Sequence, residues 1–203
     1  IRNVGLFDLT SFSKFEIKSD KAHKELQKIC TANIKNEVGK CTYTNMLNPD
    51  GGIETDLTVV CIDINHFWII SSAVSRERDK FHIKKYLSND IELKDVTDDF
   101  CVFGIFGPKS RALMKLISKD DFENDHFKFG TGKYITIGGI KCWAQRLSYV
   151  GELGFELYVK FNYSRKIYEL LTHKGKDFNL SNCGMHAMDI MRMESGFLHW
   201  GHD

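Results

Sequence analysis

Alternating apolar and polar residues predict several β-strands along the 203-residue chain. Cys41–Leu47 and Ile53–Asp63 flank the segment Asn-Pro-Asp-Gly-Gly, in which proline suits the second turn position and glycine supplies a positive φ. This arrangement predicts a β-hairpin. Further strands are predicted at Lys14–Ile17, Phe67–Ser72, Cys101–Phe106, Tyr134–Ile137, Ile140–Arg146 and Phe155–Val159.

Apolar residues at helical spacing predict helices between these strands. In Asp20–Ala32, for example, Ala22, Leu26 and Ile29 fall on one face. The other predicted helices are Arg76–Leu87, Lys109–Ser118, Ser164–His173 and Cys183–Phe197.

The order strand, turn, helix occurs twice, which indicates two related halves at 1–98 and 99–203 within one domain of residues 1–203. Four residues of the first half are matched at constant spacing in the second: Phe15, Ile17, Lys21 and Ile29 by Phe103, Ile105, Lys109 and Ile117. Strand–helix units followed by hairpins predict an α+β fold with antiparallel sheets rather than a doubly wound parallel sheet. The sequence contains no glycine-rich phosphate-binding loop.

Composition excludes several classes of partner. Lys and Arg number 28 against 27 Asp and Glu, so the net charge of +1 creates no field that favours nucleic acid or anionic lipid. No apolar run approaches the roughly 20 residues that a transmembrane helix needs. We therefore predict neither a nucleic-acid nor a membrane partner.

The six cysteines are scattered without a C-x-x-C pair, so we predict buried free thiols, no zinc or other metal site, and a reducing compartment. His199, His202 and Asp203 have a spacing that a metal would accept, but they follow a glycine near the chain end and we favour no metal there. Because the chain starts at Ile1, we expect a piece of a longer polypeptide. Its Lys-, Ile- and Asn-rich composition favours a bacterial cytoplasm over a mitochondrial matrix.

Two carboxylate-bearing segments are candidates for chemistry. In strand geometry Glu54 and Asp56 share one face, which fits either proton transfer or a solvated surface. Glu156 follows a turn containing Gly151 and Gly154, and it lies between apolar neighbours. A carboxylate there must face water or meet N–H donors, and it suits a planar ligand edge with two such donors. Spacing alone favours the structural interpretation of both segments.

Ordered motifs resemble the aminomethyltransferase (glycine cleavage T-protein) folate-binding family. The matching segments are Val4-Gly5-Leu6-Phe7-Asp8-Leu9-Thr10, Gly51-Gly52-Ile53 with Asp56-Leu57, Phe106-Gly107-Pro108, Tyr149 with Gly151-Glu152, and Arg192-Met193-Glu194. Phe12-Ser13-Lys14-Phe15 and His199-Trp200-Gly201-His202-Asp203 are more similar to the carboxyl-terminal folate domain of dimethylglycine and sarcosine dehydrogenases and oxidases.

The resemblance implies the aminomethyltransferase folate-binding fold and an enzyme domain that binds tetrahydrofolate. Such a domain captures a methylene group from an oxidised N-methyl amine as 5,10-methylenetetrahydrofolate. A flavin domain carrying FAD, outside these residues, would oxidise the amine substrate. Two alternatives stay open: a glycine cleavage aminomethyltransferase that works with a lipoyl carrier protein, and a folate-binding module without transfer chemistry.

The resemblance also implies roles for individual residues. Asp56 matches the catalytic aspartate beside the reacting folate nitrogens. Glu156 matches the glutamate that holds the pterin N–H edge, and Tyr149 and Tyr43 match tyrosines that contact folate. T-proteins carry a folate-contacting arginine where this chain has Met188. Arg192, one helical turn later, is therefore a further candidate ligand, although its family counterpart is usually structural.

Overall fold

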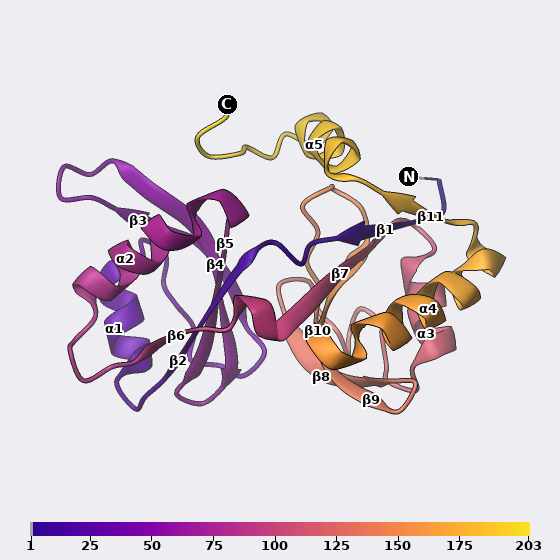
Figure 1. Ribbon diagram of the computed structural model, residues 1–203, viewed down its shortest axis with the longest axis horizontal. Coiled ribbons are helices and arrows are strands. Elements are labelled where there is room, and N and C mark those ends of the chain that lie inside the picture. The colour runs from indigo at the N-terminus through magenta and orange to yellow at the C-terminus, as the bar shows by residue number, and fades with distance from the viewer. Residues whose placement is uncertain (1) are drawn as a thin grey trace. The chain divides into compact units, whose positions relative to one another are not determined.

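The computed structural model describes residues 2–203, which form two compact units (Figure 1). The amino-terminal unit is Ser11–Thr97, and the carboxyl-terminal unit is Asp98–Asp203 together with residues 2–10. This division differs from the expected halves 1–98 and 99–203 mainly in residues 2–10. Those residues belong to the carboxyl-terminal unit because strand β1 (Val4–Asp8) pairs there with β7 and β11.

The amino-terminal unit is a five-stranded antiparallel sheet in the order β3-β4-β5-β2-β6. Helices α1 (Ala22–Ile29) and α2 (Arg76–Tyr86) supply Leu26 and Ile83 to a core that includes Leu57 and Phe67 from the strands. The strands are β2 (Ser13–Lys18), β3 (Cys41–Leu47), β4 (Ile53–Asp63), β5 (His66–Ser71) and β6 (Leu93–Asp95).

The carboxyl-terminal unit is a six-stranded sheet in the order β11-β1-β7-β10-β9-β8, in which β1 and β11 are parallel and the other pairs are antiparallel. Its strands besides β1 are β7 (Phe100–Phe106), β8 (Gly132–Ile137), β9 (Ile140–Gln145), β10 (Gly154–Lys160) and β11 (Leu180–Cys183). Its helices are α3 (Ser110–Ile117), α4 (Ser164–Gly175) and α5 (Met185–Glu194).

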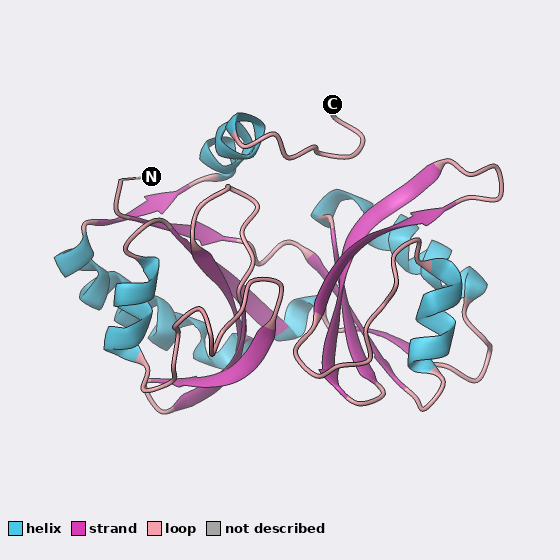
Figure 2. Ribbon diagram, turned by 180° about the vertical axis from the view of Figure 1, so that it is seen from behind, coloured by secondary structure: helices cyan, strands magenta, loops and turns pink. Residues whose placement is uncertain are grey.

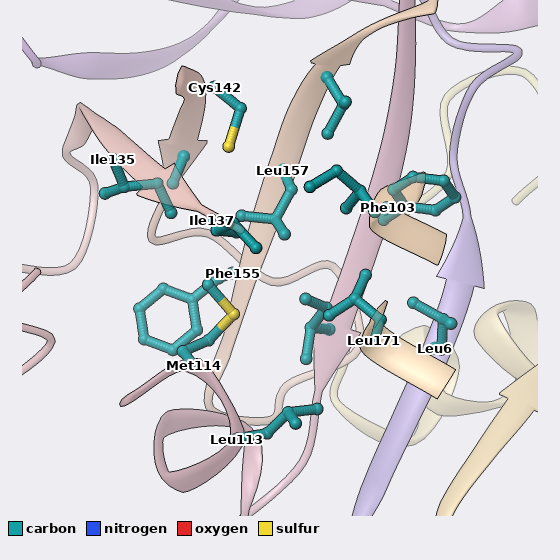
Figure 3. Packing of buried hydrophobic residues seen from close by; sticks show 14 of the residues in the cluster. Leu6, Phe103, Leu113, Met114, Ile135, Ile137, Cys142, Phe155, Leu157 and Leu171 are labelled. Atoms are coloured by element: carbon teal, nitrogen blue, oxygen red, sulfur yellow. The ribbon is translucent and has the colours of Figure 1, made fainter. Parts of the chain in front are cut away.

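The core of this unit lies between the sheet and helices α3 and α4. Met114 and Leu171 come from the helices, and Phe103, Phe155 and Leu157 come from the sheet (Figure 3). Figure 2 shows the helices and strands of both units in separate colours. Short 3₁₀ helices also occur between these elements, at Ala73–Ser75, Thr97–Asp99, Phe161–Tyr163 and Lys176–Phe178.

The observed elements confirm the predicted α+β class. Both strands of the predicted hairpin have the expected bounds, whereas α1 is shorter than the predicted Asp20–Ala32 because Cys30 adopts an extended backbone. Strands β6 and β11 were not predicted, since they span only 3 and 4 residues and lack a sustained alternation. No helix in residues 2–203 is long and apolar enough to cross a membrane.

The residues that suggest an internal repeat fall on two strand–helix pairs, β2 with α1 and β7 with α3. Helices α1 and α3 each have 8 residues, and each follows a lysine at its N-cap, Lys21 and Lys109. The preceding strands β2 and β7 bury Phe15 and Phe103 in their respective cores. The residues matched by sequence spacing therefore lie in two strand–helix pairs, and the internal repeat itself stays a prediction.

Cysteine burial follows the prediction for four of the six residues. Cys30, Cys61, Cys101 and Cys142 are buried free thiols, and Cys41 and Cys183 are half-buried free thiols. Within residues 2–203, no group of three or more His, Cys, Asp or Glu side chains is arranged to hold a metal ion.

Candidate functional site

The β3–β4 hairpin presents Asp56 and Tyr43 on the same face of the amino-terminal sheet. The Tyr43 hydroxyl donates a hydrogen bond of 2.9 Å to Oδ2 of Asp56. Thr55 and Leu57, the neighbours of Asp56, are buried on the opposite face, whereas Asp56 is half-buried. The sequence-based prediction that Glu54 and Asp56 share a face is confirmed.

The two carboxylates on this face have different surroundings. Glu54 lies 3.9 Å from Nε of Arg78, which comes from α2, so a cation faces it. Asp56 instead accepts the neutral Tyr43 hydroxyl at Oδ2, and no described residue donates to its Oδ1. Asp56 is therefore the carboxylate with an oxygen able to accept a proton or face a developing positive charge.

The hairpin is held in shape by its turn. Oδ1 of Asn48 accepts hydrogen bonds from the backbone N–H groups of Asp50 at 3.1 Å and Gly52 at 2.9 Å. Gly51 has a φ of 83°, a conformation that glycine adopts without strain. These local contacts fix the register that places Tyr43 diagonally across from Asp56.

Glu156 lies on β10 in the carboxyl-terminal unit, opposite Gly104 on β7 and Gln145 on β9. Its Oε2 accepts the Tyr158 hydroxyl at 3.0 Å and Nε2 of Gln145 at 3.3 Å. Burial raises the pKa of Glu156, and these two hydrogen bonds oppose that effect. Glu156 is thus a half-buried carboxyl group without an ion-pair partner among residues 2–203.

Tyr149 belongs to the loop before β10 and packs against the segment after α5. Its hydroxyl donates to the carbonyl oxygen of Leu198 at 2.9 Å, and its ring stacks on Phe197 with centroids 6.1 Å apart. Gly151 has a φ of 72°, and a Cβ there would lie 2.1 Å from Oγ of Ser195. The loop and the end of α5 are therefore closely fitted.

Arg192 is buried and fastens the carboxyl-terminal segment. Its Nε donates to Asp189 at 2.8 Å, and its Nη1 donates to the carbonyl oxygen of Phe197 at 3.1 Å and to Oδ2 of Asp203. The hydrogen bond that Arg192 donates to Asp203 raises the pKa of Arg192, burial opposes this rise, and the bond to Asp189 adds to it. Met188, at the position of the expected arginine, is buried with 5% of its surface exposed.

The structure thus groups the predicted residues in three places. Tyr43 and Asp56 are in contact, Tyr149 and Arg192 meet the same segment through Phe197, and Glu156 has surroundings of its own. Sequence reasoning missed Gln145 and Tyr158, the two donors to Glu156. Alternation along β10 places Tyr158 on the face that Glu156 occupies, whereas Gln145 comes to that face through the pairing of β9 with β10.

Comparisons with known proteins identify the family. The profile of the GCVT N-terminal domain matches residues 1–203. The chain belongs to this family. A 4-methylaminobutanoate oxidase (formaldehyde-forming) from Paenarthrobacter nicotinovorans is 33% identical over 201 residues, 98% of this chain and 24% of that protein. Mitochondrial dimethylglycine dehydrogenase from Rattus norvegicus is 33% identical over 204 residues, 99% of this chain and 24% of that protein.

The family fold is also found among solved structures. Glycine cleavage system aminomethyltransferase T from Bartonella henselae superposes with a TM-score of 0.83 at 20% identity, covering 98% of this chain and 52% of that one. The predicted aminomethyltransferase fold is therefore confirmed. This GCVT-family chain spans about a quarter of the length of the two relatives above.

Proposed function

We propose that this GCVT-family chain is the tetrahydrofolate-binding, one-carbon-transfer part of an enzyme that demethylates an N-methyl amine of the dimethylglycine or sarcosine type. Tetrahydrofolate supplies the nucleophilic nitrogens that accept the methylene group. FAD would belong to an amine-oxidising flavin domain outside these residues. The two relatives named above are an oxidase and a dehydrogenase of methylated amines by their names, which supports this substrate class.

The observation that carries the proposal is the state of the Glu156 carboxyl group. A carboxylate has about four acceptor positions. Tyr158 and Gln145 occupy two of them on Oε2, and no described residue donates to Oε1. A half-buried carboxylate with one oxygen still able to accept fits the N–H edge of a pterin, which offers donors side by side.

Asp56 is proposed as the catalytic residue. Its carboxylate would stabilise positive charge that develops at the reacting amine and would accept the amine proton. Tyr43 holds Oδ2 by its 2.9 Å hydrogen bond and leaves Oδ1 for this work. A module that only bound folate would have no need of such a carboxylate, so Asp56 favours the catalytic reading over the binding-only alternative.

Tyr149 and Arg192 are proposed to have different roles in folate binding. Tyr149 would pack along the folate, in keeping with its family position, while its hydroxyl stays on Leu198. Arg192 is engaged by Asp189, Phe197 and Asp203, so we propose that it acts by holding the segment on which Tyr149 rests.

A bacterial cytoplasm remains the proposed location.

A glycine cleavage aminomethyltransferase is the second candidate, and it would need a lipoyl carrier protein as partner. The match to aminomethyltransferase T in fold supports it. Met188 favours the demethylating candidate, because a methionine cannot form the charged contact expected of the T-protein arginine. A flavin domain in the same polypeptide would decide between the two.

A thermal-shift measurement tests folate binding. The stable reduced folate 5-formyltetrahydrofolate, added at 100 times its dissociation constant, should stabilise the chain by about 2.7 kcal/mol. The same addition to the Glu156→Gln variant should give a much smaller shift, because the amide offers one acceptor oxygen without charge. Equal shifts in both proteins would remove Glu156 from the binding site, and no shift in the unmodified chain would count against folate binding itself.

A further inference from the structure

A network of hydrogen bonds runs along one face of β9 and β10 and ends at Glu156. The indole Nε1 of Trp143 donates to Oε1 of Gln145 at 3.2 Å. Nε2 of Gln145 donates to the Tyr158 hydroxyl at 3.2 Å and to Oε2 of Glu156 at 3.3 Å. Tyr158 in turn donates to the same Oε2 at 3.0 Å. The three side chains before Glu156 are almost fully buried, with 1–2% of their surface exposed.

The Trp143 indole fixes the donor and acceptor roles in this hydrogen-bond network. An indole N–H can only donate, so it must meet the oxygen of the Gln145 amide, and the amide nitrogen must then point toward Glu156. Tyr158 accepts from that nitrogen, which leaves its own proton for Glu156. Reversing the Gln145 amide would set two N–H groups against each other at Trp143. Gln145 and Tyr158 therefore both donate to Oε2 of Glu156, which is the final acceptor of the network.

Gly132 leaves the space that the Trp143 indole occupies. Gly132 on β8 pairs with Gln145, and a Cβ on Gly132 would lie 2.6–2.8 Å from atoms of the Trp143 indole. The absence of that side chain leaves the space in which the ring lies. The neighbouring strand thus holds the indole that orients the Gln145 amide.

We propose that Gln145, oriented by Trp143, is a positioning residue that keeps Oε2 of Glu156 as an internal acceptor and presents Oε1 to the N–H donors of a reduced pterin ring. This rests on the proposed folate binding. The groups that face Glu156 are Tyr158 on its own strand, the neutral Gln145 on β9 and Gly104 on β7. No charged group of residues 2–203 pairs with it, so the donors from Gln145 and Tyr158 are what opposes protonation of the half-buried carboxyl.

The test is the titration of Glu156 in the 203-residue chain, followed by carboxyl-carbon NMR, together with the dissociation constant of 5-formyltetrahydrofolate as a function of pH. Gln145→Met should move the Glu156 midpoint upward by about one pH unit, as expected for the loss of one hydrogen bond to a charged group. As the pH is lowered, protonation of Glu156 weakens folate binding, and in this variant that loss of affinity should begin at a correspondingly higher pH. Tyr158→Phe, which removes one oxygen, should act in the same direction and keeps the test open if Gln145→Met does not fold.

The matched control is Gln27→Met, the same chemical change at the chain's other glutamine, and it should leave both curves in place. An unchanged Glu156 midpoint in Gln145→Met and Tyr158→Phe would overturn the proposal. So would a loss of affinity that is equal at every pH, because that is the result of a packing defect. If the unmodified chain does not bind the folate, the proposed function fails, and the Glu156 titration still decides the role of Gln145.

Discussion

The hydroxyl of Tyr43 and the carboxylate of Asp56 meet across the β3–β4 hairpin at 2.9 Å, although Tyr43 has 64% of its surface exposed. This contact joins a residue expected to touch folate with the residue expected to carry the chemistry. An exposed tyrosine that holds one carboxylate oxygen leaves the other free to act, and the consequences of that arrangement are measurable.

Asp56→Asn should lower the turnover of one-carbon transfer by about 10²–10⁴-fold, the range for loss of a group that moves a proton or stabilises charge. Affinity for 5-formyltetrahydrofolate should change little. Steady-state kinetics of one-carbon transfer, measured together with the proposed amine-oxidising flavin domain, and calorimetric folate binding separate the two effects. Equal losses in turnover and affinity would contradict the catalytic assignment, and Tyr43→Phe, which keeps the carboxylate, should cost less than Asp56→Asn.

Glu156→Gln should raise the melting temperature near pH 7 while weakening binding of 5-formyltetrahydrofolate by about 10–100-fold. Burial raises the pKa of Glu156, so ionising this carboxyl group costs free energy in the folded state. That cost is absent below the ordinary value of 4.5 and develops as the pH rises through the raised pKa. The stability gain of the variant should therefore vanish near pH 4. Thermal unfolding across pH 4–8 measures it, and a variant less stable than the parent at pH 7 would oppose this account.

Glu16 should contribute to acid sensitivity of the amino-terminal unit. Burial raises the pKa of this carboxyl, but hydrogen bonds from Lys18, Trp68 and His66 outweigh it and bring the pKa to about 2. Burial lowers the pKa of His66, so near neutral pH its uncharged ring donates to Glu16 at 2.8 Å.

A depressed carboxyl pKa stabilises the fold above the unfolded-state value of 4.5, and that contribution is lost as the pH falls toward 2. Glu16→Gln should cost about 1–2 kcal/mol at pH 7 and flatten the decline in stability over that acidic range. Urea unfolding at a series of pH values checks both. An unchanged acid decline would show that other carboxyl groups cause it.

Gly151→Ala should destabilise the chain by about 1–3 kcal/mol, because it combines left-handed backbone strain with a clash against Ser195. Gly139→Ala is the matched control, since Gly139 has a φ of 80° and no atom within 4 Å of an added Cβ. Gly139→Ala should therefore destabilise the chain only through left-handed backbone strain, by about 1 kcal/mol. Denaturant unfolding compares them. Hydrogen exchange should also show weakened protection after α5 in Gly151→Ala, and equal behaviour of the two variants would argue against the clash.

The sequence by itself determined the hairpin, most strands and helices, and the family motifs. These features depend on local periodicity and turn chemistry, which neighbouring residues specify on their own. The bounds of β3 and β4 are a case in point, because proline and glycine in the intervening turn leave little choice of register.

Only the tertiary structure decided which distant residues become neighbours. Residues 2–10 join the carboxyl-terminal unit because β1 pairs with β7 and β11, strands far along the chain. Likewise, Gln145 meets Glu156 through the pairing of β9 with β10, and Asp203 meets Arg192 where the chain turns back on α5. Alternation assigns a side chain to one face of a sheet, but the partner on that face is selected by burial of the whole core.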